Sequence, residues 1–258
     1  MVYRIAAALL AALTASTAHA AGGACAAQSG PATAALVELY TSEGCDSCPP
    51  ADRWLSTLSP AAAGQHIVPL SLHVDYWDYI GWKDPFAKPL FAARQRELAA
   101  IARRRTVYTP QVVLAGKDFR GWPARSRFVD AVAAVNATPA RATISLAIDA
   151  AGKGAFDLKA AASVPKPEDR EDTALFVVVY ENGLSNRVTA GENRGVTLNH
   201  DFVAREWWGP LALDSLGSTT LERSVGGVPL VNGGVAAFVQ SRRTGDVLQA
   251  LALPVCKS

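Results

Sequence analysis

A pair of cysteines three positions apart follows directly after a short apolar run near the start of this chain. Residues 36–40 (LVELY) have the composition of a buried strand, and a polar turn then leads to Cys45 and Cys48. Two prolines at 49–50 come next, and proline is tolerated in the first turn of a helix because the N–H groups there have no helical partners. The segment therefore predicts a strand, a turn and a helix, with the cysteines at the helix N-terminus.

This position gives the two thiols a chemical role. The positive end of a helix dipole stabilises a thiolate and lowers the pKa of the thiol. We therefore expect Cys45 to act as a nucleophile and Cys48 to resolve the mixed disulfide. Asp46, beside Cys45, acts in the opposite direction because a nearby negative charge disfavours the thiolate. The sequence leaves open whether the helix dipole or the charge of Asp46 has the larger effect on the redox potential. The mechanism also requires that another molecule can reach the sulfur atoms.

The first 20 residues have the features of a cleavable secretory signal. Arg4 precedes an apolar run at 5–13, and Ala18, His19 and Ala20 supply a small-residue cleavage site. The apolar run is too short to span a bilayer. We therefore expect a periplasmic or secreted protein of 258 − 20 = 238 residues, beginning with a loose leader at 21–33 that is rich in Ala, Gly, Ser and Pro.

The chain has four cysteines, and Cys25 and Cys256 lie at opposite ends of the exported part. An even cysteine count in an exported protein favours disulfide bonds. The simplest pairing joins Cys25 to Cys256 as a structural disulfide and leaves the closely spaced pair for chemistry. The alternative is that both terminal cysteines are unpaired.

Charge and composition argue against some classes of partner. The formal net charge is only +2 and half of the residues are hydrophobic, which suffices for one large core or two ordinary ones. No basic block is interleaved with aromatic residues, so the sequence predicts neither a nucleic-acid nor a membrane-surface partner.

The hydrophobic pattern changes near residues 137–142. Residues 34–138 alternate strand and helix patterns, whereas residues 139–258 carry short runs of alternating apolar and polar residues broken by Gly, Asn and Pro. Such runs are typical of an antiparallel sandwich. We predict two domains, an α/β domain over 34–138 and a smaller all-β, sandwich-like domain over 139–258.

The order of elements in the first half resembles the thioredoxin fold. A strand, a CxxC pair at a helix start, a second strand and a helix are followed by Thr109-Pro110, which leads into a hairpin, and by a final helix. The resemblance implies a cis peptide bond before Pro110, with Pro110 packed against the cysteine pair. It also implies that the backbone of Thr109 is presented to an extended substrate.

A closer resemblance covers most of the exported chain. It is carried by the segments ELYTSEGC (38–45), CPPAD (48–52), HVDYWD (73–78), GWKDPF (81–86), YENGL (180–184) and HDFV (200–203). These segments are similar to an uncharacterised family of secreted bacterial proteins, a domain of unknown function with a thioredoxin-like core. The resemblance implies a fold and a compartment, but it implies no established substrate.

Four further residues are candidates for the site. Glu38, on the strand before the cysteines, and Asp75, at the end of the second strand, could each accept a proton from a thiol. Their plain alternatives are a solvated glutamate and an ordinary loop aspartate. Trp77 and Trp82 could line a peptide-binding surface, or they could pack the aromatic loop in which they lie.

The function predicted from these residues is exported thiol–disulfide exchange on protein or small-molecule disulfides, without a cofactor and with a possible upstream redox partner. One alternative is a non-catalytic binding module in which Cys45–Cys48 is a permanent structural disulfide. Another is a metallochaperone that binds copper through two thiolates and a histidine. A zinc site is less well supported because it needs four ligands and the chain has no second CxxC. The substrate and the direction of exchange stay open.

Overall fold

The structure is a computed structural model that describes residues 25–58, 66–152, 155–228 and 232–256. The expected secretory signal at residues 1–20 lies outside the described residues. Among the helices of the described part, none is both long and apolar enough to cross a membrane.

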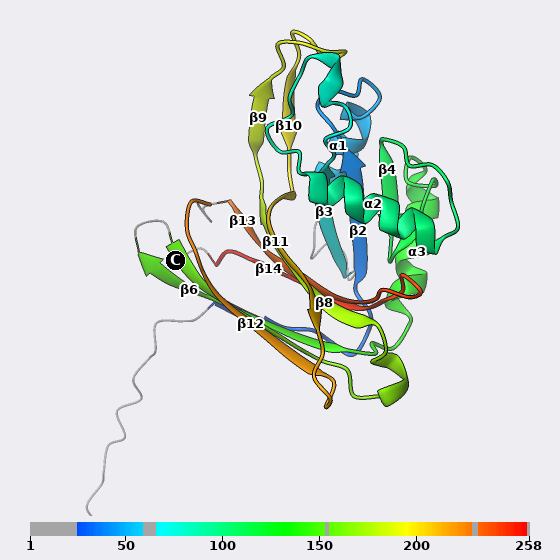
Figure 1. Ribbon diagram of the computed structural model, residues 1–258, viewed down its shortest axis with the longest axis vertical. Coiled ribbons are helices and arrows are strands. Elements are labelled where there is room, and N and C mark those ends of the chain that lie inside the picture. Colours follow the sequence, from blue (N-terminus) through cyan, green and yellow to red (C-terminus); the bar gives the residue numbers. More distant parts are fainter. Residues whose placement is uncertain (1–24, 59–65, 153–154, 229–231, 257–258) are drawn as a thin grey trace, which may run out of the picture.

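Strands dominate the secondary structure (Figure 1). The helices are α1 (Pro49–Ser56), α2 (Pro89–Ile101) and α3 (Arg125–Asn136), with short 3-10 turns η2 (Asp78–Ile80) and η3 (Pro167–Asp169). The strands are β1 (Cys25–Gln28), β2 (Ala35–Thr41), β3 (Ile67–His73), β4 (Gln111–Leu114), β5 (Lys117–Asp118), β6 (Thr143–Gly152), β7 (Ala155–Ser163), β8 (Thr173–Glu181), β9 (Leu184–Arg187), β10 (Thr197–His200), β11 (Val203–Ala212), β12 (Ser218–Val225), β13 (Gly233–Ser241) and β14 (Val247–Pro254).

One sheet runs through both halves of the described chain. Its strand order is β14-β13-β8-β11-β3-β2-β4-β5. β2 and β3 are parallel neighbours and are fully buried, as the apolar runs of both segments indicate. β11 adds to the free edge of β3 through the parallel pair Val203 and Ser71, and β8, β13 and β14 extend the sheet from there.

The predicted fold class, an α/β thioredoxin-like domain followed by a smaller all-β sandwich-like domain, is wrong. The chain is mostly β, with 43% strand and 18% helix, and strands from both halves share the large sheet. The predicted boundary at 138–139 falls between α3 and β6, but the large sheet continues across it. Sequence patterns indicate which segments are extended, but they do not show that β11 pairs with the edge of β3.

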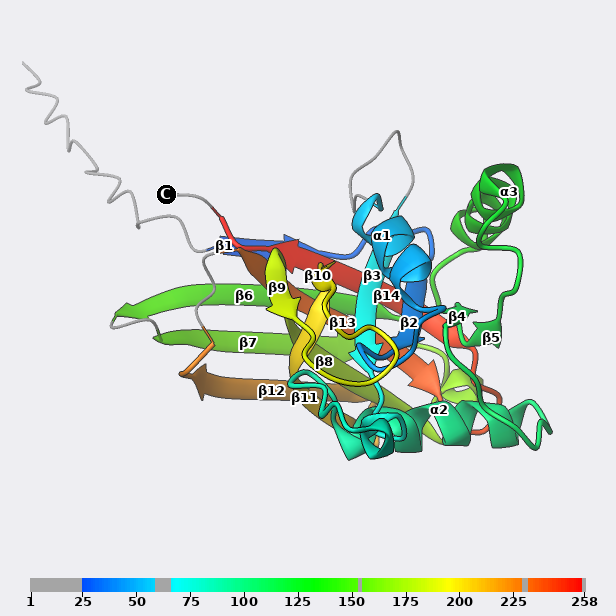
Figure 2. The ribbon, with the colours of Figure 1, turned by 90° about the horizontal axis from the view of Figure 1, so that it is seen from above.

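A second sheet, of order β1-β6-β7-β12, faces the C-terminal part of the large sheet (Figures 1 and 2). Between its terminal residues Thr173 and Glu181, β8 is apolar and is buried on both faces. Phe176 and Val178 point into a core shared with β2, β3 and the helices, whereas Val177 and Val179 point into the core between the two sheets. This alternation follows from the two-residue period of a strand.

The stretch expected to be a loose leader is partly ordered. Residues 25–28 form β1, which pairs antiparallel with β6, and Ala32 forms an isolated bridge with Pro139. Cys25 is joined to Cys256 by a disulfide. The composition does not indicate a strand at residues 25–28, because the strand is short. It is held by pairing with β6 and by the disulfide to Cys256.

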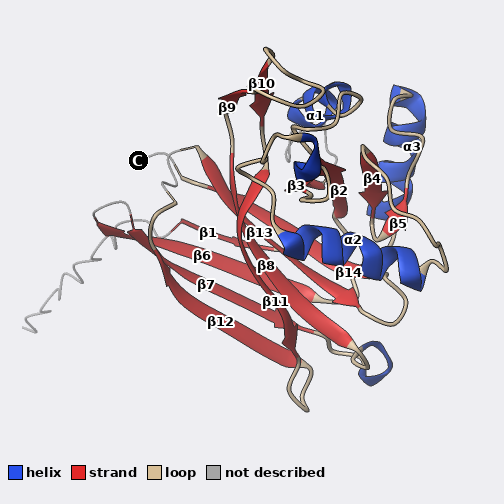
Figure 3. Ribbon diagram, turned by 45° about the horizontal axis from the view of Figure 1, so that its top comes forward, coloured by secondary structure: helices blue, strands red, loops and turns tan. Residues whose placement is uncertain are grey.

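Helices α1, α2 and α3 all lie around the β2–β5 end of the large sheet (Figure 3). α2 is tied to β2 by a buried ion pair in which Arg94 Nε lies 2.6 Å from Glu38 Oε1. α1 packs against β2, β3 and β10. The β9–β10 hairpin therefore stands beside the start of α1, which carries the two closely spaced cysteines (Figure 2).

Candidate functional site

Cys45 and Cys48 lie where the sequence places them, between the end of β2 and the start of α1. Cys48 is the N-cap residue of α1, and the prolines at 49–50 occupy its first two positions. The two cysteines are joined by a disulfide. Each has a relative exposure of 0%, so neither sulfur is open to solvent in this structure, contrary to the accessibility that the mechanism requires.

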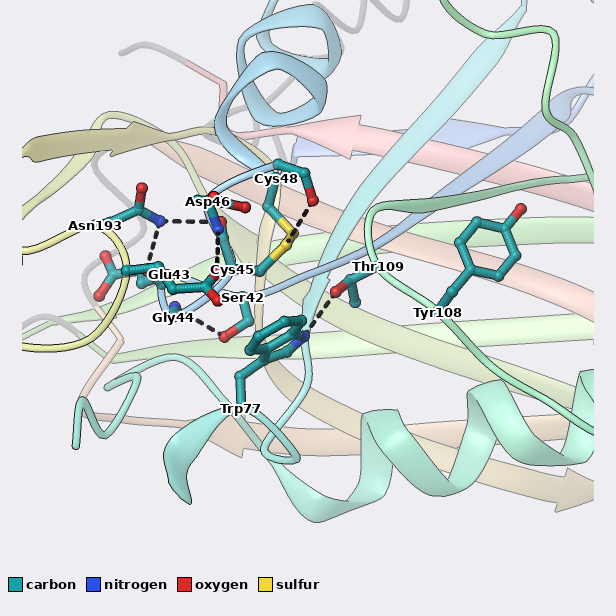
Figure 4. Close-up of a disulfide and its surroundings, with 12 residues drawn as sticks. Ser42, Glu43, Gly44, Cys45, Asp46, Cys48, Trp77, Tyr108, Thr109 and Asn193 are labelled. Carbon is teal, nitrogen blue, oxygen red and sulfur yellow. Dashed lines mark hydrogen bonds between the residues drawn. A yellow bond between two sulfur atoms is a disulfide. The ribbon is translucent and has the colours of Figure 1, made fainter. Parts of the chain in front are cut away.

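Side chains from two different segments contact the loop that holds the buried disulfide (Figure 4), and we call these segments its cover. Asn193, in the β9–β10 connection, donates its amide hydrogens to the carbonyl oxygens of Glu43 and Cys45, both at 2.9 Å. The neighbouring Glu192 accepts a hydrogen bond from the backbone N–H of Asp46 at 3.0 Å. The β9–β10 connection thus occupies the backbone polar groups of the cysteine loop.

The aromatic loop after β3 forms the second part of the cover. The indole N–H of Trp77 donates to the hydroxyl of Thr109 at 2.7 Å. A Cβ atom placed on Gly44 would lie 3.1 Å from the Cβ atom of Trp77, so the glycine allows close packing of Trp77 on the cysteine loop. The peptide bond between Thr109 and Pro110 is cis.

Glu43 connects these parts through its buried carboxylate. Its oxygens lie 2.9 Å from the indole nitrogen of Trp82, 3.3 Å from Nδ2 of Asn186 and 3.1 Å from Nε2 of His200. The backbone N–H of Glu43 donates to Asp84 at 2.8 Å. The cysteine loop, the aromatic loop and the β9–β10 hairpin are therefore joined through one residue.

The buried ion pair of His73 and Asp84 lies beside Glu43. His73 Nδ1 is 2.7 Å from Asp84 Oδ2, and both side chains are fully buried. Burial alone lowers the pKa of His73, but the charge and hydrogen bond of Asp84 outweigh it, so the pKa is raised. Burial acts to raise the pKa of Asp84, but the charge and hydrogen bond of His73 outweigh it and the pKa is lowered. The imidazolium–carboxylate form is the favoured state of the pair.

The sequence profile of a family described as "Protein of unknown function (DUF1223)" matches residues 36–240. The chain belongs to the DUF1223 family. No curated protein matches it significantly. Among solved structures it is similar to protein AGR_C_4864 from Agrobacterium tumefaciens, with 23% identity, a TM-score of 0.61 and coverage of 89% of this chain and 98% of that one. It is also similar to HBP35 of Porphyromonas gingivalis, with 13% identity, a TM-score of 0.64 and coverage of 88% and 76%. These likenesses show a shared fold.

In this DUF1223 chain, Glu38 lies on the face of β2 that points away from the helix carrying the cysteines. Glu38 pairs with Arg94 of α2 on one face of β2, whereas Thr41 lies beside Asp52 of α1. Residues three apart in a strand point to opposite faces, so the β2 backbone separates Glu38 from α1. Asp75 is half-buried at the start of the aromatic loop.

Trp77 and Trp82 lie against the cysteine loop, Trp77 beside Gly44 and Trp82 on the carboxylate of Glu43. Thr109 contacts Trp77, and Pro110 follows Thr109 into β4. Trp77 and Trp82 are half-buried, and both direct their indole N–H groups to partners within the protein. They pack the aromatic loop in this structure, which is the plainer of the two alternatives that the sequence allows.

Sequence reasoning missed the roles of Asn193, Glu43 and Asp52. Asn193 and Glu43 carry no recognisable spacing, because their contacts join segments about 150 positions apart. Asp52 did carry a signal, since it lies four residues after Cys48 on the same helix face. Nowhere in the described chain do three or more His, Cys, Asp or Glu residues form a group that could hold a metal ion.

Proposed function

We propose that this protein is an exported thiol–disulfide oxidoreductase whose Cys45–Cys48 pair works beneath a movable cover. The observation that carries the proposal is the disulfide at the N-terminus of α1, closed over by side chains of two loops. A helix N-terminus favours the thiolate that forms when such a disulfide is reduced. A periplasmic or secreted location is supported by the two disulfides, which persist in oxidising compartments.

The exchange balances without a cofactor. In the reducing direction, the Cys45 thiolate attacks a substrate disulfide, and one substrate sulfur leaves with the electron pair of the broken bond. Cys48 then attacks the Cys45 sulfur of the mixed disulfide and releases the second substrate thiol. The protein ends with the Cys45–Cys48 disulfide and the substrate is reduced; the reverse sequence oxidises a substrate dithiol.

Access to the disulfide requires the cover to open. Asn193 and Glu192 hold the β9–β10 connection against the cysteine loop with three hydrogen bonds. Trp77 of the aromatic loop donates a fourth hydrogen bond to Thr109. A protein hydrogen bond contributes about 0.5–1.5 kcal/mol net, so opening costs only a few kcal/mol from these contacts. A substrate that supplies its own partners to the backbone of residues 43–46 would offset part of that cost.

The complete burial of both cysteines favours a second candidate, a non-catalytic module in which Cys45–Cys48 is structural. The two candidates differ in redox potential. Structural disulfides of exported proteins have potentials below about −300 mV, whereas catalytic pairs lie between about −120 and −270 mV.

Equilibration of the protein in glutathione and dithiothreitol buffers, followed by alkylation and peptide mass spectrometry, measures both disulfides in one sample. Cys25–Cys256 serves as an internal structural reference. Exchange is supported if the Cys45–Cys48 potential lies in the catalytic range and is at least 50 mV less negative than that of the reference disulfide. In this two-electron titration, a 50 mV gap corresponds to roughly a fiftyfold ratio of equilibrium constants. Equal and very negative potentials for the two disulfides would establish the structural module.

A further inference from the structure

A strongly basic surface lies around the segment that leads to the cis proline. Residues 103–120 carry five cationic side chains and one carboxylate, whereas the whole 258-residue chain has a formal net charge of only +2. Three of the cations follow α2, one lies in β5 and one follows β5, and all are exposed (Arg103, Arg104, Arg105, Lys117 and Arg120). Cations at the C-terminal end of a helix interact favourably with its dipole, which explains the three that follow α2. The helix dipole does not explain Arg120, which comes from a different element.

Two of these arginines converge on one carboxylate. Arg104 Nη1 and Arg120 Nε each lie 3.3 Å from Oδ2 of Asp118, whose side chain is only 6% exposed. The other oxygen, Oδ1, accepts hydrogen bonds from the hydroxyl of Tyr108 at 2.6 Å and from Nε2 of Gln111 at 3.0 Å. Burial acts to raise the pKa of Asp118, but these hydrogen bonds and the charge of Arg104 outweigh it, so the pKa is lowered. Asp118 therefore stays ionised and holds the two guanidinium groups together.

One carboxylate does not neutralise two guanidinium groups. The side chains of Arg104 and Arg120 are 48% and 71% exposed. A guanidinium has five N–H donors in a fixed planar fork, and among the described residues Arg120 donates one of them to Asp118. The fork matches the geometry of a carboxylate. The two arginines are therefore pre-organised to bind a second carboxylate, supplied by another molecule.

Tyr108 links this surface to the cysteine pair. The guanidinium of Arg120 lies over the ring of Tyr108, 5.0 Å from its centroid. The next residue, Thr109, accepts the hydrogen bond of Trp77, which packs on the cysteine loop. Figure 4 shows Tyr108 and Thr109 on one extended segment, with Thr109 nearer the disulfide and the Tyr108 side chain directed away from it. An extended polypeptide that reaches the disulfide beside this segment would bring residues a few positions from its reacting cysteine to the arginines.

The charges on the other side of the disulfide have the opposite sign. Asp46 and Glu192 are exposed, and the Glu192 side chain accepts a hydrogen bond from the backbone N–H of Asp46 at 3.0 Å (Figure 4). Like charges repel, so these two carboxylates disfavour an acidic residue directly beside the reacting cysteine. The two sides together favour a polypeptide whose acidic residues lie on the side of Tyr108.

We propose that Arg104 and Arg120 bind carboxylates of an acidic polypeptide substrate and thereby determine which disulfides exchange with Cys45–Cys48. Opposite charges raise the rate at which two partners associate, and salt weakens the effect. A polypeptide fits this surface better than an anionic membrane does, because the arginines adjoin the cysteine pair and only a polypeptide supplies both a carboxylate and a disulfide. The exchange step of this inference rests on the proposed function, whereas the binding step does not depend on it.

Two synthetic peptide disulfides test the specificity. Each peptide has one cysteine, joined to a second copy of itself, and two glycines separate the cysteine from a flank of three glutamates in one peptide and three glutamines in the other. The reduced protein is mixed with each peptide disulfide, and the release of peptide thiol is followed at about 20 mM and about 500 mM salt. The readout is the ratio of the two second-order rate constants, because a loss of structure alone would lower both rates and leave their ratio unchanged.

We expect the unaltered protein to reduce the glutamate peptide about tenfold faster than the glutamine peptide at low salt and equally fast at high salt. The double variant Arg104→Gln, Arg120→Gln should bring the low-salt ratio to about one. Arg141→Gln is the matched control and should keep the preference, since Arg141 is 43% exposed and is also paired with a carboxylate, that of Asp169. Equal rates for the two peptides at low salt, or a preference that the double variant retains, would overturn the inference while exchange itself stands.

A binding measurement separates this inference from the proposed function. Fluorescein-labelled peptides with serine in place of cysteine cannot exchange, and their binding to the oxidised protein is followed by fluorescence anisotropy. Stronger binding of the glutamate peptide, lost at high salt and in the double variant, supports the acidic-polypeptide surface even if neither peptide disulfide is reduced and the proposed function fails. Equal binding of the two peptides overturns the inference. Binding of phosphatidylserine-containing vesicles through the same arginines, without binding of the glutamate peptide, would assign the surface to a membrane and also overturn it.

Discussion

The carboxylates near the cysteine pair differ chiefly in the partner that each one has. Glu38 pairs with Arg94, Glu43 with His200 and Asp84 with His73. The pair with His73 lowers the pKa of Asp84, whereas burial without a bonded cation raises the pKa of Asp52. Glu38, which the sequence singled out as a proton acceptor, is thus bonded to a guanidinium, whereas Asp52 has no bonded cation within the described residues.

Asp84→Asn tests the ion pair at His73. Because the folded-state pKa of His73 is raised, the pair contributes stability below the unfolded pKa of about 6.5 and loses it as the pH rises through the raised value. We expect the variant to lose about 3–5 kcal/mol of unfolding free energy at pH 5.5 and clearly less at pH 9.5, measured by urea unfolding. Asp201→Asn, which also removes a carboxylate from a backbone N–H, is the control. A loss that is constant with pH would contradict the assignment.

Asn193→Ala tests the cover at a single residue. The change removes two hydrogen bonds to the cysteine loop, worth about 1–3 kcal/mol together. Reduction of Cys45–Cys48 by dithiothreitol should then proceed about tenfold faster, because an opened cover is needed for attack. Asn136→Ala is a close control, since Asn136 also donates to two backbone carbonyls, those of Thr33 and His66. An unchanged rate in Asn193→Ala would show that attack does not pass through this contact.

At the scale of elements, the β9–β10 hairpin and the aromatic loop share the task of closing the site. The hairpin lies beside α1 and reaches the cysteine loop through Glu192 and Asn193, and the aromatic loop reaches it through Trp77 and Trp82. Neither segment lies within the large sheet. Both can therefore move without breaking its strand ladders.

Reduction of Cys45–Cys48 should loosen these two segments. Two thiols need more room than a disulfide because their sulfur atoms are no longer bonded, and the site around them is closely packed. We expect hydrogen exchange measured by mass spectrometry to increase in residues 75–85 and 188–196 after reduction. Exchange in β8 and β13, two interior strands of the large sheet, should stay unchanged and provides the internal control. An equal increase throughout the chain would instead indicate global destabilisation.

At the scale of the whole molecule, the two sheets and both chain ends are tied together. β1 joins the smaller sheet and β14 lies at the edge of the large sheet, and the Cys25–Cys256 disulfide links the first residue of β1 to the segment that follows β14. The sequence separation of 231 residues makes this a long loop. Long loops lose the most unfolded-state entropy when they are closed.

Replacement of both Cys25 and Cys256 by Ala should lower the unfolding free energy by about 5 kcal/mol on the chain-entropy account. Urea unfolding of the variant and of the unaltered protein measures the difference. The potential of Cys45–Cys48 should be unaffected, since the two disulfides lie in different parts of the structure. A change in that potential would show that the chain ends and the cysteine loop are coupled.

The sequence determined the local features of this protein. The apolar runs of β2 and β3, the prolines after Cys48 and the even number of cysteines were enough to predict buried strands, a helix start at the pair and the joining of Cys25 to Cys256. Each of these rests on interactions between near neighbours or on a simple count. The expectation of two domains rested on the change of hydrophobic pattern near residues 137–142, and such a change does not show whether strands on its two sides join one sheet.

Only the tertiary structure decided what surrounds the cysteines. The edge of β3 pairs with β11, and Asn193 reaches the cysteine loop from a distant segment. Glu38 forms an ion pair with Arg94 rather than lying beside a thiol. Edge pairing, burial and ion pairing depend on which distant segments meet, and one-dimensional patterns do not contain that information. For this reason the sequence located the cysteine pair, while its burial and its neighbours became visible only in three dimensions.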